Sequence, residues 1–165
     1  MTVELEFVLL AILIGLGATL VLDLWGLLLR LVLRVPMADF GMLGRWLGHF
    51  PRGRFAHESI AKAEPIRGEH AIGWIVHFAI GIAFAAALLA IMGLEWAHRP
   101  TFLPPVLFGV VTVLIPFFTL QPGMGAGIAA SKTPKPNMAR LRSLMSHTVF
   151  GIGMYLSAWL VANNN

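Results

Sequence analysis

The chain alternates between long apolar runs and polar connecting segments. The apolar runs cover residues 7–29, 71–94, 102–121 and 144–162. A helix needs about 20 apolar residues to cross the roughly 30 Å hydrocarbon core of a bilayer, and it must be a helix because lipid offers the backbone no hydrogen-bond partners. The pattern therefore predicts an all-α, polytopic membrane protein whose four transmembrane helices form a single domain over residues 1–165.

The composition agrees with this prediction. Hydrophobic residues make up 58% of the chain and charged residues only 12%, whereas soluble domains carry about 25% charged residues. Much of the apolar surface must therefore face something other than water, and the lipid bilayer is the expected partner. The chain has no cysteine, which excludes disulfides and thiolate metal sites.

Lysine and arginine concentrate in two connecting segments. Seven lie within residues 30–70 and four within residues 122–143, whereas only Arg99 lies between the second and third runs. By the positive-inside rule both basic segments are cytoplasmic loops and both termini face outside. A nucleic-acid partner is excluded, because it needs a basic patch on a folded soluble domain. Basic side chains near a membrane attract anions, and those predicted to contact lipid or another anion are Arg45, Arg52, Arg54, Lys132 and Arg142.

The two loops differ in their local patterns. In the first loop, apolar residues recur at helical spacing over residues 40–50, which predicts a short helix in the membrane interface. The glycines in this stretch weaken that prediction, because each costs about 1 kcal/mol in a helix. The second loop begins with PGMGAG at residues 122–127, which predicts an irregular turn. The sequences HFAIGI (77–82) and HTVFGI (147–152) match at three positions and predict two repeated helical hairpins, with chance similarity as the alternative.

Three of the four runs carry one ionisable residue within a row of small residues. At intervals of four, which share one helix face, the rows are Gly15, Thr19 and Asp23; Gly73, His77 and Gly81; and Ser143, His147 and Gly151. Small residues let helices approach closely, so the rows are predicted to face one another. The helical rise of about 1.5 Å per residue places the ionisable groups in the cytoplasmic third of the bilayer, where the third run ends. The predicted lining of a polar, cytoplasm-facing cavity is Asp23, His77, His147, Thr19 and Gln121.

An aspartate in the middle of a span costs about 2.5–3.5 kcal/mol of insertion free energy. An ionisable residue inside a membrane therefore indicates a functional site. The leading hypothesis is a protein that binds or passes a small solute, linked to protons. Because four helices are few for a transporter, this hypothesis also predicts a homodimer that forms through the small-residue helix faces. The alternatives are a membrane-embedded metal or haem enzyme that uses the same histidines, a non-catalytic partner subunit, and a hydrogen-bond network that only fixes helix packing. No metal-ligand motif, cofactor or catalytic residue is identified.

Three stretches carry a resemblance to a known family. They are GRWLGHFPRGRFAHESI (44–60), GEHAIGWIVHFAIGIAFA (68–85) and QPGMGAGIAASKTPKPNMARLRSLMSHTVFGIGMY (121–155). They resemble the bacterial membrane family DUF2938, a domain of unknown function, and the resemblance runs from about Gly15 to Leu160. It implies a small multi-pass protein of the bacterial cytoplasmic (inner) membrane. The family brings no established activity, so the resemblance assigns no catalytic residue.

Overall fold

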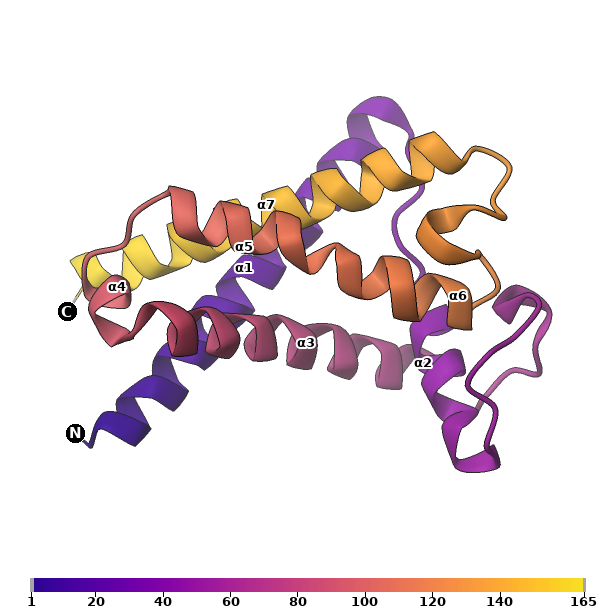
Figure 1. Ribbon diagram of the computed structural model, residues 1–165, viewed down its shortest axis with the longest axis horizontal. Coiled ribbons are helices and arrows are strands. Elements are labelled where there is room, and N and C mark those ends of the chain that lie inside the picture. The colour runs from indigo at the N-terminus through magenta and orange to yellow at the C-terminus, as the bar shows by residue number, and fades with distance from the viewer. Residues whose placement is uncertain (1, 165) are drawn as a thin grey trace. The chain divides into compact units, whose positions relative to one another are not determined.

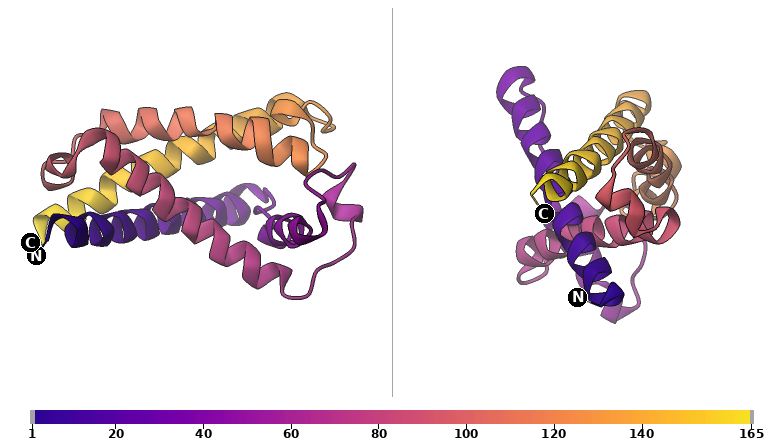
Figure 2. Two further views of the ribbon diagram at one scale, coloured as in Figure 1. Left: turned by 60° about the horizontal axis from the view of Figure 1, so that its bottom comes forward. Right: turned by 90° about the vertical axis from the view of Figure 1, so that its left-hand side faces the viewer.

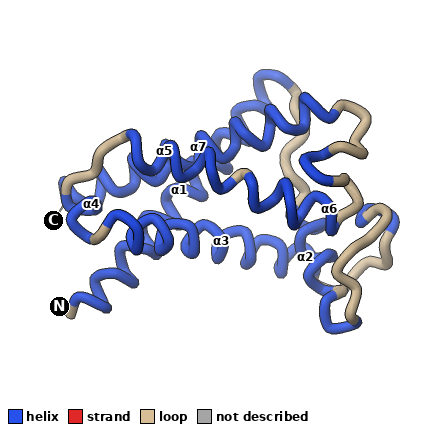
Figure 3. Tube along the Cα trace, in the orientation of Figure 1, coloured by secondary structure: helices blue, strands red, loops and turns tan. Residues whose placement is uncertain are grey.

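The structure is a computed structural model that describes residues 2–164. Helices account for 77% of the described residues, and no strand occurs among them (Figure 3). Four helical segments are long and apolar enough to cross a membrane, which confirms the predicted fold class. These segments are Val3–Leu33, Glu69–Met92, Leu103–Gly123 and Pro136–Asn163.

Three of these segments are single helices and the third is composite (Figure 1). The single helices are α1 (Val3–Leu33), α3 (Glu69–Met92) and α7 (Pro136–Asn163). The third segment joins α5 (Leu103–Thr112), the π-helix η3 (Pro116–Leu120) and α6 (Gln121–Gly123). The shorter elements are α2 (Phe40–Gly48), α4 (Leu94–His98) and three 3-10 turns, η1 (Phe50–Arg52), η2 (Ile60–Lys62) and η4 (Ile128–Ala130).

Two helices extend beyond the apolar runs that predicted them. α1 continues to Leu33 and ends where Arg34 adopts a left-handed conformation, with φ 54°. α7 begins at Pro136, well before the apolar run at residue 144, and proline is favoured in the first turn of a helix. An apolar run marks only the part of a helix that is suited to lipid. It therefore underestimates the length of a helix whose polar ends continue beyond the run.

The chain packs as two compact units. The single transmembrane domain over residues 1–165 stays a prediction. Unit 1 comprises residues 1–37, 78–111 and 146–165, and unit 2 comprises residues 38–77 and 112–145. Helices α3 and α7 each contribute to both units. In unit 1, the start of α1 and the end of α7 lie at the same end (Figures 1 and 2).

Unit 1 has an apolar core formed by α1, α3, α4 and α7. Ile14, Ala18, Ala85, Met154 and Ala158 are fully buried in it. Large apolar side chains cover the outer faces of the same helices: Leu24 is 65% exposed, Ile91 70% and Leu160 54%. So many exposed apolar side chains are typical of a surface that does not face water, as expected for membrane-spanning helices.

Small residues set the distances between helices in unit 1. A Cβ added at Gly15 of α1 would lie 2.5 Å from the Cα of Ile82 on α3, so the two backbones are in contact. α1 meets α7 in the same way, because a Cβ at Gly153 would lie 2.9 Å from the Cα of Ala18. Gly15 and Thr19 of the first row therefore lie against Gly81 of the second row. That the whole rows face one another stays a prediction.

The row on α7 packs differently from the prediction. A Cβ at Gly151 would lie 2.5 Å from the carbonyl oxygen of Pro105, so this face of α7 packs against α5. α7 contacts α1 through Gly153 and Ser157 instead, two residues further along. A helix with small residues on two faces can pack closely against two neighbours, and the four-residue spacing alone did not distinguish them.

Gly15→Ala is expected to destabilise the protein in detergent by about 1–3 kcal/mol, since the added methyl meets backbone atoms that cannot move alone. Gly26→Ala on the same helix is the matched control, because its Cβ would meet only the Met37 side chain at 3.8 Å. The control should be neutral or stabilising, as alanine is favoured over glycine in helices by about 1 kcal/mol. Thermal unfolding of both variants measures the difference, and equal melting temperatures would contradict the proposed contact.

Candidate functional site

The predicted site residues are divided between the two units. Thr19, Asp23 and His147 belong to unit 1, and His77 and Gln121 belong to unit 2. Their meeting in one cavity stays a prediction.

Thr19 is sealed in a helix contact. It is 1% exposed, and its hydroxyl donates to the carbonyl oxygen of Gly15 over 2.8 Å within α1. The same hydroxyl faces Gly81 of α3, where any added Cβ would clash with it. Thr19 therefore sets the distance between α1 and α3. Asp23 lies one turn further along α1 and is partly exposed.

His147 lies among aromatic rings of unit 1. Its ring donates a hydrogen bond to the backbone of Gly109 on α5, and its centroid lies 6.4 Å from that of Phe84 on α3. Phe84 also contacts Phe108 and Phe150 edge to face, at 6.3 and 6.0 Å. One imidazole thus links α3, α5 and α7 while it remains partly exposed.

His77 is held by a stack of rings in unit 2. Its ring lies 3.9 Å from Phe40 of α2, with an interplanar angle of 26°, and 5.8 Å from Trp74 of its own helix. The stack fixes the orientation of the imidazole. The sequence pattern missed this contact because Phe40 had been assigned to an interfacial helix.

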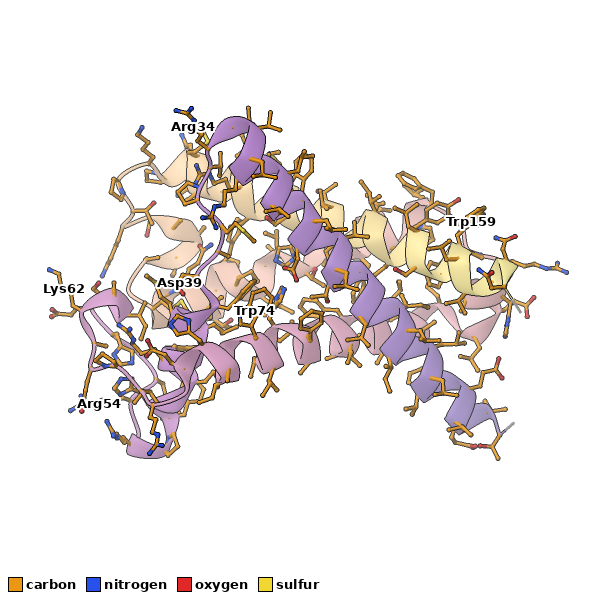
Figure 4. The ribbon with its side chains drawn as sticks, turned by 180° about the vertical axis from the view of Figure 1, so that it is seen from behind. Arg34, Asp39, Arg54, Lys62, Trp74 and Trp159 are labelled. Atoms are coloured by element: carbon orange, nitrogen blue, oxygen red, sulfur yellow. The ribbon has the colours of Figure 1, made fainter. Side chains whose placement is uncertain are left out.

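Helix α2 confirms the short helix predicted in the first loop, and its glycines have a packing role. The side chain of Asp39 caps α2 by accepting from the backbone N–H of Gly41 over 2.9 Å, and Figure 4 labels Asp39 on this helix and Trp74 on α3. Gly44 lies directly against the backbone of Glu69 and Gly73 of α3. Glycines that weaken an isolated helix here allow α2 to pack against α3.

The third span becomes irregular at Pro116. Over the π-helix η3 the hydrogen bonds widen, so that the backbone N–H of Gln121 donates to the carbonyl of Pro116. The Gln121 side chain donates to Ser143 Oγ of α7 over 3.2 Å, and its Oε1 atom is buried without a hydrogen-bond partner. π-Helical turns are frequent at functional sites.

Arg45 and Glu69 form a largely buried ion pair. Arg45 Nε and Nη2 donate to the two carboxylate oxygens over 2.8 and 2.6 Å, and the side chains are 17% and 11% exposed. The same carboxylate accepts from the backbone N–H of Ile66 over 2.9 Å. Hydrogen bonding to Glu69 raises the pKa of Arg45. Arg45 was predicted to contact lipid or another anion, and the anion that engages it in the structure is Glu69.

The first and second loops are joined in unit 2. The backbone N–H groups of His57 and Ile60 donate to the carbonyls of Gly123 and Met124 over 2.9 and 3.0 Å. The indole of Trp46 packs against Gly123 and donates to the carbonyl of Phe55 over 2.8 Å. These contacts and the Arg45–Glu69 pair order residues 49–66, which we call the loop lobe.

The remaining predicted cations lie on the surface. Arg54, Lys132 and Arg142 are exposed, and Arg52 forms an exposed ion pair with Glu64 over 3.1 Å. Figure 4 shows Arg54 and Lys62 at the outer edge of the loop lobe. An open cleft of about 480 Å³ lies there, lined by Arg54, His57, Glu58, Ser59, Lys62, Ala63 and Glu64.

Sequence reasoning passed over His49, which is fully buried in the loop lobe with its ring 4.9 Å from that of His57. No group of three or more histidine, aspartate or glutamate side chains comes together in a metal-binding arrangement within residues 2–164. The hydrophobic pattern of the first loop held no signal for a buried histidine, because the contacts of His49 come from Glu64 and His57, which are distant from it along the loop.

Comparison with known families gives one match. A family model described as a protein of unknown function (DUF2938) matches residues 12–161. No curated protein and no solved structure matched the chain.

Glu69→Gln is expected to destabilise the loop lobe by about 1–3 kcal/mol, less than the roughly 3–5 kcal/mol of a fully buried pair, because it leaves Arg45 without its counter-charge. Glu64→Gln is the matched control, since the exposed Arg52–Glu64 pair should contribute less than about 1 kcal/mol. Limited proteolysis of residues 50–66 in detergent measures the difference. Cleavage of both variants at the wild-type rate would show that the ion pair does not hold the lobe.

Proposed function

The chain belongs to the family DUF2938, and from its four apolar helices and their polar residues we propose that it is a membrane protein that binds or passes a small solute, linked to protons. The polar groups proposed to meet the solute are Asp23, His77, His147 and Gln121. Thr19, which the sequence placed with them, is left out because it is sealed in the contact between α1 and α3. The observation that carries the proposal is that three spans each keep one ionisable side chain partly accessible.

A comparison with Thr19 supports this reading. A polar residue that serves only helix packing is sealed and satisfied within its own contact, as Thr19 is. Asp23, His77 and His147 are instead partly exposed, on helices that otherwise present apolar side chains. Keeping a titratable group at such a position is costly, and carboxylates and imidazoles in spans commonly serve as solute or proton sites.

Histidine suits a proton-linked step because its ordinary pKa is about 6.5. The broken third span supports the same reading, because irregular helices in transporters supply backbone groups to a bound solute. Gln121 follows the π-helix directly and brings an amide oxygen that has no hydrogen-bond partner among residues 2–164.

We place the protein in the bacterial inner membrane as a multi-pass protein, with both basic loops in the cytoplasm and both termini outside. Arg52, Arg54, Lys132 and Arg142 would then lie near anionic lipid head groups. A homodimer through small-residue helix faces stays part of the proposal.

Proteoliposomes that contain the purified protein and a pH-sensitive dye test the function against a panel of cationic, anionic and neutral solutes. Asp23→Asn and His77→Phe should each lower the initial rate of solute or proton flux at least tenfold. His77→Phe retains a ring to stack on Phe40, so it separates the proposed chemistry from packing. His98→Gln is the control, because His98 lies between the second and third spans and pairs with Glu6 in the first turn of α1. Flux that neither Asp23→Asn nor His77→Phe changes, for every solute tried, would contradict the proposal.

The absence of cysteine allows a direct test of topology with single-cysteine variants. In intact spheroplasts a membrane-impermeant maleimide should label Asn164→Cys, whereas Ala61→Cys in the exposed part of the first loop should react only after lysis. The reverse pattern would show that the basic loops face outward.

A further inference from the structure

Two histidines of the loop lobe, His49 and His57, pack against each other. In each ring, one nitrogen has no hydrogen-bond partner among the described residues. The rings of His49 and His57 lie 4.9 Å apart between centroids, with an interplanar angle of 61°. Nδ1 of His49 and Nε2 of His57 are both buried, and neither has a hydrogen-bond partner in the described part of the chain. Buried polar atoms are nearly always satisfied in proteins, so this pair calls for an explanation.

The surroundings of His49 determine which of its nitrogens carries the proton. Its Nε2 atom lies 3.0 Å from the carbonyl oxygen of Glu64. A carbonyl only accepts hydrogen bonds, so Nε2 carries the hydrogen and Nδ1 holds a free lone pair inside the lobe. Histidines that bind metals show this pattern, in which a backbone carbonyl orients the ring from its other nitrogen.

His57 is also held in place and kept neutral. Its backbone N–H donates to the carbonyl of Gly123 over 2.9 Å, which fixes the start of the side chain. Burial lowers the pKa of His57, because it disfavours the charged form of the ring. The ring is therefore neutral at neutral pH, which is the form that binds metals.

We propose that His49 and His57 form a two-imidazole binding site for a first-row transition-metal ion, with Cu²⁺ the most strongly bound divalent ion. Imidazole suits copper and zinc, and affinities in this series peak at copper. The open cleft beside His57 gives a route to the site, and the carboxylates of Glu58 and Glu64 line it. No third histidine, aspartate or glutamate joins the pair in the described residues, so water or an added ligand completes the coordination.

This site is independent of the proposed solute function, since it uses neither Asp23, His77 nor His147. A water molecule that donates to both lone pairs is the competing explanation, and metal titration distinguishes the two. The full-length, untagged protein in detergent is treated with a chelator and titrated with Cu²⁺. One ion per chain should bind, with an electron paramagnetic resonance spectrum that shows two imidazole nitrogens.

His57→Gln should weaken Cu²⁺ binding at least tenfold and remove the two-nitrogen signature, whereas the control His98→Gln should bind within twofold of the wild type. Equal binding by His57→Gln and the wild type would overturn the proposal. The unaltered chain provides a test that does not depend on the folding of a variant. With ¹⁵N-labelled histidine, added Zn²⁺ should shift only Nδ1 of His49 and Nε2 of His57. The absence of these shifts, or equal shifts at other histidines, would overturn the proposal.

Discussion

Helices that lie in lipid gain little from burying apolar side chains against each other, because the acyl chains are equally apolar. Close backbone packing must hold them together instead. Unit 1 meets this constraint with a glycine at each principal helix contact: Gly15 against Ile82, Gly153 against Ala18, and Gly151 against Pro105. The positions of the polar residues depend on these contacts. Thr19 lies one turn after Gly15, and His147 one turn before Gly151, so a change in either glycine would move a polar group as well.

Unit 2 is held by a different set of interactions. The order of its loops comes from the Arg45–Glu69 pair and from backbone hydrogen bonds such as those of His57 and Ile60. An ion pair stabilises a structure only when its geometry repays the loss of solvation. Two short hydrogen bonds and the Ile66 N–H on the same carboxylate supply that geometry here. The buried histidines of the loop lobe depend on this closure, because they lie on the segment that it orders.

The sequence predicted the spans and the short helix α2, because hydropathy and helical spacing report directly on the surroundings of each residue. It did not predict the partners of the loop residues. Arg45 and Glu69 are 24 positions apart, and nothing in the periodicity of either segment links them. The stacking of His77 on Phe40 was missed for the same reason. The sequence predicted the candidate site as a set of residue types at one depth in the membrane. The packing within each unit shows in addition which of these side chains are buried and which are partly exposed.

The polar residues of the spans differ in where they find their hydrogen-bond partners. A threonine hydroxyl both donates and accepts, so Thr19 satisfies itself on the carbonyl of Gly15 and needs nothing from outside its helix. A carboxylate only accepts, so Asp23 must take its donors from beyond its own backbone ladder. His77 is held in a different way. The face of its ring stacks on Phe40, whereas the nitrogens of an imidazole, which carry its protons and hydrogen bonds, lie at the ring edge. Packing on the ring face therefore fixes the orientation of this imidazole, and a fixed orientation is what a group that binds a solute or exchanges protons would need.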